Sequence, residues 1–215
     1  MVEDKIIKTP PFKRIFDAVI SGLVLIVFSP LLLVIFLLAK LESLFNPEAR
    51  GKFFYHEVRM SQGRPFNFYK IRIFKTKVLK EVLGREGFIH TKPLEREESN
   101  LTRTGYLVKK FYLDELPQFW CVLTGQMSIV GPRPWNPVDY ENDVKAGNFR
   151  KKVLKAGLTG LVQISKGRNG DHKNGTDLDE KYIELVKNLS PLKLLLLDLW
   201  IMGRSIRLIL RGEGL

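Results

Sequence analysis

The chain has 215 residues, with 35 lysines and arginines against 23 aspartates and glutamates, and a formal net charge of +12. This length suits one compact domain with an appendage, and the positive charge favours polyanionic partners such as nucleic acid, anionic lipid or phosphorylated small molecules. A single cysteine excludes an intrachain disulfide, and three widely separated histidines do not have the spacing of a zinc site.

An apolar segment over residues 16–39 contains only one charged residue, Asp17. As a helix it would be roughly 36 Å long, which is enough to cross a bilayer. It is too long for a secretory signal peptide, and no small-residue cleavage site follows it. Ser29 and Pro30 lie at its centre, where a proline breaks a backbone hydrogen bond and kinks a helix.

Basic residues flank this segment on both sides: Lys5, Lys8, Lys13 and Arg14 precede it, and Lys40, Arg50 and Lys52 follow it. Basic residues mark the cytoplasmic side of a membrane. A re-entrant helix with a central break would leave both clusters there, whereas a span would place one outside. These features alone leave both arrangements open, and most apolar segments of this length span the membrane.

The next part of the chain has the pattern of short strands followed by helices. Residues 53–74 predict two strands around a turn at residues 62–65, because glycine and proline favour turns. Residues 76–83 predict a helical turn, and residues 84–100 a charged, irregular loop.

The second half of the chain predicts mostly helices. One helix is predicted to begin near Asp114, a favoured N-cap residue, and to stop at Gly125. A basic helix over 138–155 and a glycine-rich loop over 157–175 follow. Two further helices are predicted at the end of the chain, over 177–188 and 191–210. The last carries three arginines on one face, which fits either a solvated surface or a helix lying on a membrane: Arg204, Arg207 and Arg211.

Two groups of residues have the chemistry of a phosphoryl-transfer site. The adjacent Asp114 and Glu115 fit a helix N-terminus structurally. A carboxylate there is expected to stay ionised, and an ionised aspartate is able to attack a phosphoryl centre. Arg133, between two prolines and after Gly131, is either an exposed loop arginine or a preorganised phosphate ligand.

These residues resemble the motifs of the bacterial sugar transferases, small monotopic phosphoglycosyl transferases, over about residues 12–214. The two most specific matches are Asp-Glu-Leu-Pro-Gln at 114–118 and Ser-Ile-Val-Gly-Pro-Arg-Pro at 128–134. Weaker matches are Arg59, Lys70, Arg72, Thr102, Arg103, Gly105, residues 157–163, Asp179 and Tyr182. The chain departs from the family pattern at Glu57, Ser61, Ile73 and Phe74, and Gly167-Arg168 is displaced by one residue.

The resemblance implies roles for the matching residues. Asp114 would be the nucleophile and the ligand of a magnesium ion, and Glu115 a second essential acid. The residues that would bind substrate or phosphate are Lys70, Arg72, Arg103, Arg133, Gln163, Arg168, Asp179 and Tyr182. The implied reaction transfers a sugar 1-phosphate from a UDP-sugar to polyprenyl phosphate, expected to be undecaprenyl phosphate. It would pass through an aspartyl-phosphosugar intermediate and begin glycan assembly.

The implied fold is α+β and mainly helical. A re-entrant membrane helix over 12–40, broken at Ser29 and Pro30, would precede a compact catalytic domain over 41–215 with short strands and surface amphipathic helices. The resemblance thus reverses the preference for a span and places the protein on the cytoplasmic face of the bacterial inner membrane, in contact with anionic lipids. No long segment precedes the motifs, so the minimal catalytic form is expected.

The sequence leaves other points open. Charge and anchor alone also fit a non-catalytic, membrane-anchored scaffold or polyanion-binding protein. A nucleic-acid partner is not expected, because the sequence has no RNP, zinc or helix-turn-helix signature. The identity of the sugar, the glycan pathway and the oligomeric state, including a homodimer, are not readable from the motifs.

Overall fold

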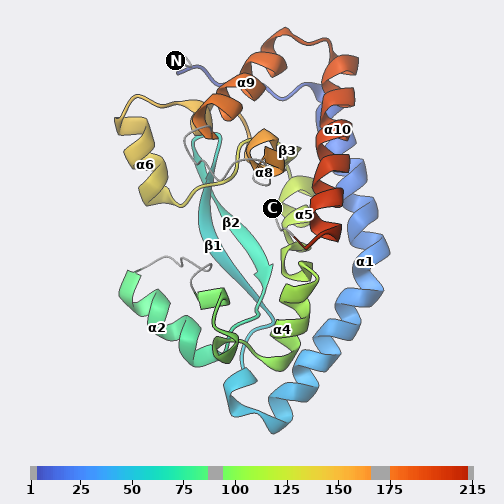
Figure 1. The fold of residues 1–215 in the computed structure, drawn as a ribbon, viewed down its shortest axis with the longest axis vertical. Coiled ribbons are helices and arrows are strands. Elements are labelled where there is room, and N and C mark those ends of the chain that lie inside the picture. The colour runs from blue at the N-terminus through green and yellow to red at the C-terminus, as the bar shows by residue number, and fades with distance from the viewer. Residues whose placement is uncertain (1–3, 87–93, 166–174, 213–215) are drawn as a thin grey trace. The chain divides into compact units, whose positions relative to one another are not determined.

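The computed structural model describes residues 4–86, 94–165 and 175–212, and these residues are mainly helical with a few short strands, as predicted (Figure 1). The strands are β1 (Phe54–Ser61), β2 (Arg64–Ile71), β3 (Ser128–Val130) and β4 (Gly157–Thr159). The α-helices are α1 (Pro11–Phe45), α2 (Thr76–Glu86), α4 (Arg103–Lys110), α5 (Gln118–Leu123), α6 (Pro137–Lys145), α7 (Arg150–Val153), α8 (Leu161–Ser165), α9 (Gly175–Asn188) and α10 (Pro191–Leu210). The short 3₁₀ helices are η1 (Pro47–Ala49), η2 (Glu98–Asn100) and η3 (Leu113–Glu115).

The chain divides into two compact units that do not follow sequence order. The first unit comprises Met1–Gly22, Val58–Phe66 and Trp120–Leu215. The second comprises Leu23–Glu57 and Asn67–Phe119. Helix α1, both strands of the β1–β2 hairpin and helix α5 therefore contribute residues to each unit. The predicted division into segments 12–40 and 41–215 stays a prediction.

Helix α1 is long and apolar enough to cross a membrane, judged by length and composition. It has 35 residues, and its most apolar 18-residue window has a mean hydropathy of 2.9. Only 6% of that window is buried within the protein. Exposed apolar side chains on this scale are typical of contact with lipid or with another protein.

The predicted break in the helix at Ser29 and Pro30 is wrong, because α1 continues through both residues. Pro30 has no N–H to donate to the carbonyl of Ile26, four residues earlier. The Ser29 hydroxyl donates to that carbonyl instead, at 2.7 Å from Oγ to O. This bond replaces the missing backbone partner, so the helix tolerates the proline.

The predicted hairpin is confirmed by β1 and β2, which form a two-stranded sheet, but the turn is shorter than the predicted 62–65 because β2 begins at Arg64. The two residues between them, Gln62 and Gly63, have positive φ angles of 51° and 77°. Positive φ at both central residues is the signature of a type I′ turn, whose twist matches that of the flanking strands.

The core of the second unit is a cluster of fully buried apolar side chains: Ile35, Ile71, Ile73, Phe74, Leu79, Leu101 and Val108. Ile35 is the contribution of α1 to this core. Ile73 and Phe74, which depart from the family pattern, are therefore core residues, with exposed fractions of only 1% and 0%.

The prediction of an irregular loop over 84–100 is partly wrong, since α2 extends to Glu86 and η2 forms a helical turn near the end of this range. Residues 87–93 lie outside the described part.

In the first unit, β3 and β4 pair in parallel, with Ser128 opposite Gly157 and Val130 opposite Thr159. The first turns of α1 lie beside α10 (Figure 1), where Lys13 and Asp198 form a buried ion pair. Asp17, the charged residue of the apolar segment, is also buried and accepts a hydrogen bond from the Ser128 hydroxyl at 2.6 Å. The start of α1 is thus attached to the first unit by polar contacts.

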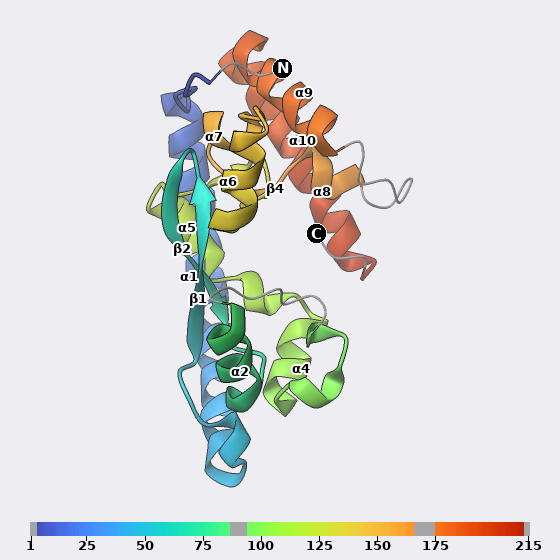
Figure 2. The ribbon, with the colours of Figure 1, turned by 90° about the vertical axis from the view of Figure 1, so that its left-hand side faces the viewer.

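Predictions for the remaining helices are confirmed for α9 and α10 and corrected for residues 138–155. That region forms two consecutive helices, α6 and α7, next to each other (Figure 2). Gly147, with a φ angle of +82°, lies between them, in a conformation that typically ends an α-helix. The predicted loop over 157–175 begins instead with β4 and α8, and residues 166–174 lie outside the described part.

Candidate active site

Asp114 is the middle residue of the 3₁₀ helix η3, in the second unit, so the prediction that it caps a longer helix is wrong. Tyr112, in the left-handed region with φ 54°, precedes η3 instead. The physical reason is Pro117, which has no N–H to continue an α-helical pattern back to Leu113. The Leu116 N–H donates to the Leu113 carbonyl at 3.2 Å, and α5 begins only afterwards.

The Asp114 carboxyl is buried, with an exposed fraction of 7%. Burial, followed by the negative charge of Glu115, raises its pKa to about 7, although the nearby Lys70 ammonium acts in the opposite direction. The expectation that this carboxyl stays fully ionised is therefore wrong near neutral pH. The helix N-terminus that would favour the charged form is absent at Asp114, and the structure buries the group.

Lys70 supplies positive charge to Asp114 from strand β2. Its side chain is also buried, with an exposed fraction of 7%, and its Nζ lies 5.9 Å from the centre of the Phe68 ring. A buried ammonium close to a buried carboxyl stabilises the ionised form of that carboxyl. Lys70 thus acts on the acidic site within the second unit, and its predicted contact with substrate phosphate stays a prediction.

Sequence reasoning missed three members of this site: Tyr55, Glu57 and Glu95. The Tyr55 hydroxyl donates to Glu57 Oε1 at 3.4 Å. The pKa of Tyr55 is raised well above its ordinary value, first by burial and then by the charges of Glu57, Asp114 and Glu95. The hydroxyl therefore stays a protonated hydrogen-bond donor. The available signal was the i, i+2 spacing of Tyr55 and Glu57 on β1, because alternate residues share one face of a strand.

Arg72 and Arg103 lie at structural positions of the second unit. The Arg72 guanidinium donates to the carbonyls of Lys52 (2.8 Å), Phe74 (2.8 Å) and Ala49 (2.5 Å). Arg103 begins α4, and its backbone N–H donates to Glu42 of α1 at 2.8 Å. Their roles as phosphate ligands stay predictions, and the Arg72 bonds indicate that it also orders the chain around it.

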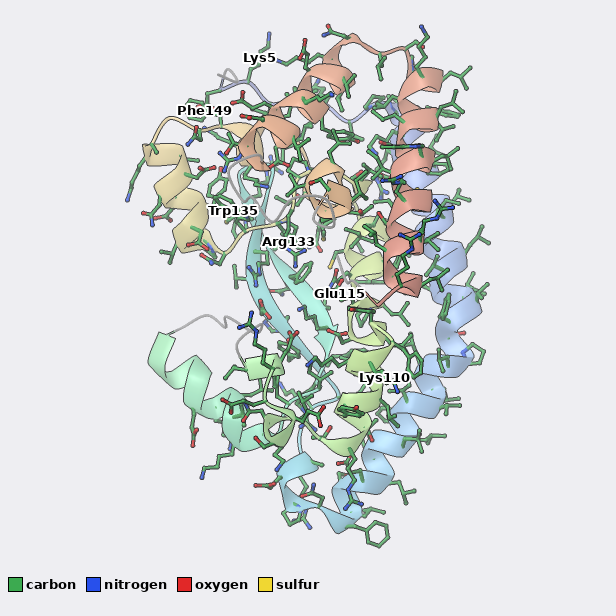
Figure 3. The ribbon with its side chains drawn as sticks, viewed as in Figure 1. Lys5, Lys110, Glu115, Arg133, Trp135 and Phe149 are labelled. Carbon is green, nitrogen blue, oxygen red and sulfur yellow. The ribbon has the colours of Figure 1, made fainter. Side chains whose placement is uncertain are left out.

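The loop that carries Arg133 follows β3 in the first unit, as Figure 3 shows. Its backbone is held by β4: the Gly131 N–H donates to the Thr159 carbonyl, and the Gly157 N–H to the Pro132 carbonyl, each at 2.9 Å. A Cβ on Gly157 would lie only 2.1 Å from the Gly131 nitrogen. The family glycines therefore permit a close backbone approach that fixes the loop.

Trp135 lies two residues after Arg133 (Figure 3), and two buried cations contact its ring. Arg150 and Lys151 each lie 5.1 Å from the centre of its ring. Asp179 pairs with both, at 2.6 Å from Lys151 Nζ and 3.6 Å from Arg150 Nε. These contacts assign Asp179 a positioning role behind the Arg133 loop, and its predicted contact with substrate stays a prediction.

Tyr182, one turn after Asp179 on α9, lies in a second buried network. Its hydroxyl donates to Asp198 Oδ1 at 2.8 Å, and Asp198 in turn pairs with Lys13 of α1. The Asp-x-x-Tyr motif thus links the Arg133 loop and the start of the apolar helix to the same helix, α9. Substrate binding by Tyr182 also stays a prediction.

Comparison with known proteins identifies the fold family. The model of the bacterial sugar transferases matches residues 8–212. The chain belongs to the bacterial sugar transferase family. It is 35% identical over 161 residues to the UDP-glucose:undecaprenyl-phosphate glucose-1-phosphate transferase of Klebsiella pneumoniae, covering 73% of this chain and 31% of that protein.

Two other relatives support the same assignment. The undecaprenyl-phosphate galactose phosphotransferase of Salmonella typhimurium is 32% identical over 209 residues, covering 94% of this chain and 41% of that protein. The exopolysaccharide production protein ExoY of Rhizobium meliloti is 33% identical over 183 residues, covering 80% and 76%. The chain spans less than half the length of the first curated relatives that it matches.

The candidates for holding a magnesium ion in this bacterial sugar transferase are two adjacent carboxylates. Within the described ranges, no three His, Cys, Asp or Glu side chains come close enough to hold a metal. Magnesium, however, is often held by one or two carboxylates together with substrate phosphates and water. Asp114 and Glu115 are adjacent carboxylates of this kind, and the charge of Glu115 contributes to the raised pKa of Asp114; magnesium binding by them stays a prediction.

Gln163 and Arg168 are the remaining residues that were predicted to bind substrate. Gln163, on α8, is completely buried, and neither of its amide atoms has a hydrogen-bond partner among the described residues. Arg168 lies outside the described residues. Their predicted contacts with substrate stay predictions.

Proposed function

We propose that the chain transfers a sugar 1-phosphate from a UDP-sugar to polyprenyl phosphate and releases UMP. The observation that carries this proposal is the buried Asp114, whose pKa is raised to about 7 beside Lys70, within the Asp-Glu motif of the bacterial sugar transferases. A carboxyl poised near neutral pH is typical of catalytic groups. The names of the relatives supply the substrate class.

The proposed reaction has two displacements at phosphorus. In the first, Asp114 in its carboxylate form bonds to the phosphorus that carries the sugar, and the bond from that phosphorus to the bridging oxygen breaks, so that UMP leaves. In the second, an oxygen of the lipid phosphate bonds to the same phosphorus and the bond to Asp114 breaks. The products are a polyprenyl diphosphate sugar and the free carboxylate.

The surrounding groups support these steps. Lys70 stabilises negative charge on and near Asp114, and Tyr55, protonated throughout, is a hydrogen-bond donor within the acidic cluster. A magnesium ion held by Asp114 and Glu115 would neutralise phosphate oxygens of the substrate. Arg133 stays the predicted phosphate ligand of the first unit, on a loop that is hydrogen-bonded to the strand β4.

The direct test is a UMP-release assay against a panel of UDP-sugars, with undecaprenyl phosphate and magnesium, using the full chain. Release with one sugar at least tenfold above the others would define the donor. Membrane binding without UMP release from any sugar would favour the alternative, a non-catalytic scaffold. The relatives differ in their sugars, glucose in one and galactose in another, so the panel must include both.

The pH profile of UMP release is expected to report Asp114. The attacking form is the carboxylate, so kcat/KM should fall as the pH drops below about 7, the pKa of this group.

Two variants test which charges set this pKa. Replacing Lys70 with glutamine removes a charge that lowers the pKa of Asp114, so the midpoint of the pH profile should move to higher pH. Replacing Glu115 with glutamine removes the repulsion and should move it to lower pH. Rates measured from pH 5 to 9 check the midpoints, and unchanged midpoints in both variants would contradict the assignment.

We further propose that α1, as one continuous helix, enters the membrane without crossing it, so that both of its ends lie on the cytoplasmic side. Both flanks of its apolar part are basic. The two ends of α1 are bonded to polar parts of the chain, through Arg14 to the Leu123 carbonyl at 2.6 Å and through Glu42 to the Thr104 N–H at 2.9 Å.

The orientation of α1 is testable with single cysteines in a Cys121→Ala background. Lys5→Cys and Phe45→Cys place one exposed thiol beyond each end of the apolar segment. In intact spheroplasts neither thiol should react with a membrane-impermeant maleimide, and both should react after lysis. Labelling of exactly one thiol before lysis would show that the helix spans the membrane.

A further inference from the structure

A cavity of about 440 Å³ lies in the first unit, and it includes none of the residues predicted to bind substrate. The tip of the hairpin forms one wall and the loop between α5 and β3 forms another. The lining residues are Ile6, Ser61, Gln62, Arg64, Pro65, Phe66, Thr124, Gly125, Gln126 and Lys155. This volume is in the range of small-ligand sites.

The walls of this cavity are held by hydrogen bonds between segments far apart in sequence. The Ser61 hydroxyl donates to the Gln126 carbonyl at 2.6 Å and accepts from the Ala156 N–H at 3.0 Å. The Gln62 side-chain amide donates to the Ile7 carbonyl at 2.9 Å. The cavity is therefore preformed, and the Ser61 departure from the family pattern is one of the residues that shape it.

The charge of the cavity is positive. Arg64 and Lys155 are its two cations, and its lining includes no carboxylate among the residues that the structure describes. The guanidinium of Arg14 adds a third cation behind the wall, since a Cβ on Gly125 would lie 3.2 Å from it. Burial and then the charge of Arg14 lower the pKa of Lys155, although the Asp17 carboxylate acts in the opposite direction. An anion in the cavity would relieve this repulsion.

Apolar side chains complete the lining of the cavity and favour an anion that also has a less polar portion. Ile6, Pro65 and Phe66 form an apolar surface next to the cations. Ile6 precedes α1 by only a few residues, and the exposed apolar side chains of that helix begin at Phe12. A ligand that combines a phosphate with a less polar portion matches both surfaces better than a bare inorganic anion.

We propose that this cavity binds a phosphate ester, with Arg64 and Lys155 contacting the phosphate and Ile6 and Phe66 the less polar portion. The headgroup of an anionic phospholipid and a soluble phosphate ester share this chemistry. The lipid fits the position of the cavity near the start of the apolar helix. Binding here does not depend on catalysis by Asp114, so it is separable from the proposed transferase activity.

The test is calorimetric titration of the full chain in a non-ionic detergent with three probes: dioctanoyl phosphatidylglycerol, glycerol 1-phosphate and inorganic phosphate. The Arg64→Gln, Lys155→Gln double variant removes both cations. The Lys187→Gln, Lys193→Gln double variant is the matched control, because it removes the same charge from exposed positions of the same unit. The Asp114→Asn variant should bind every probe as the wild type does.

We expect at least one phosphate ester to bind the wild type and the control equally, with Kd raised at least about tenfold in the Arg64, Lys155 variant. Tighter binding of the lipid than of glycerol 1-phosphate identifies a membrane headgroup as the source, and equal binding identifies a soluble phosphate ester. An Arg64→Lys, Lys155→Arg variant, which keeps both charges, should retain binding. Failure of all three probes to bind, or unchanged affinity in the Arg64, Lys155 variant, would overturn the proposal.

Discussion

Replacing Asp114 with asparagine is expected to reduce UMP release by more than about 10³-fold, because the amide cannot form the phosphoryl bond. Glu184→Gln is the matched control, since Glu184 is an exposed acid on α9 and its loss should leave the rate unchanged. Both variants should still associate with membranes, because α1 is intact. An Asp114→Asn variant as active as the wild type would exclude Asp114 as the nucleophile.

The same substitution has an expected effect on stability that separates a catalytic loss from misfolding. The folded-state pKa of Asp114 is raised above its unfolded value of 3.8, to about 7. The stability that the neutral acid contributes is complete below the unfolded pKa and is lost as the pH rises through about 7. Asparagine does not ionise, so the variant should be more stable than the wild type at pH 8, by roughly 2–4 kcal/mol. Thermal unfolding at pH 5 and pH 8 measures this difference, and a less stable variant at pH 8 would contradict the assigned burial.

Replacing Gly157 with alanine is expected to destabilise the first unit by more than about 4 kcal/mol, because no flexible side chain can move aside for the added methyl group. Its Cβ would lie 2.1 Å from the Gly131 nitrogen and 2.6 Å from the Thr159 oxygen, all backbone atoms. Separating β3 from β4 would also displace the Arg133 loop. Denaturant unfolding should therefore show a lower midpoint, and UMP release should fall with it.

Gly203→Ala is the matched control for this substitution. Gly203 lies within α10, and a Cβ there would meet no other atom within 4 Å. Alanine is a better helix former than glycine by about 1 kcal/mol, so this variant should be slightly more stable than the wild type. Equal effects of the two substitutions would show that close backbone contact at Gly157 is not the cause.

Several family motifs in this chain have structural reasons that the motif alone does not reveal. Gly105 is required because a Cβ there would lie 2.1 Å from the Ile73 carbonyl oxygen. Thr102, three residues earlier, caps α4 by accepting from the Gly105 N–H at 2.9 Å. Asp179 and Tyr182 join buried ionic networks. Part of the family signature therefore shapes the site instead of contacting substrate.

Local features of the structure were predictable because they depend on nearby residues. The glycine and proline of residues 62–65 predicted the hairpin, and the last two helices were predicted close to the bounds of α9 and α10. The apolar composition of residues 16–39 predicted the long helix. Turn residues, helix starts and hydrophobic runs act over a few positions, so the sequence alone is sufficient to place them.

Tertiary contacts decided the ionisation of Asp114 and the membership of the acidic cluster. The pKa of Asp114 depends on burial and on Lys70, which is 44 positions away in a different element. Tyr55 and Glu57, on β1, come close to Asp114 only through folding. Desolvation and charge interactions depend on distance in space, so motifs located Asp114 and Glu115 but could not give Asp114 its pKa near 7.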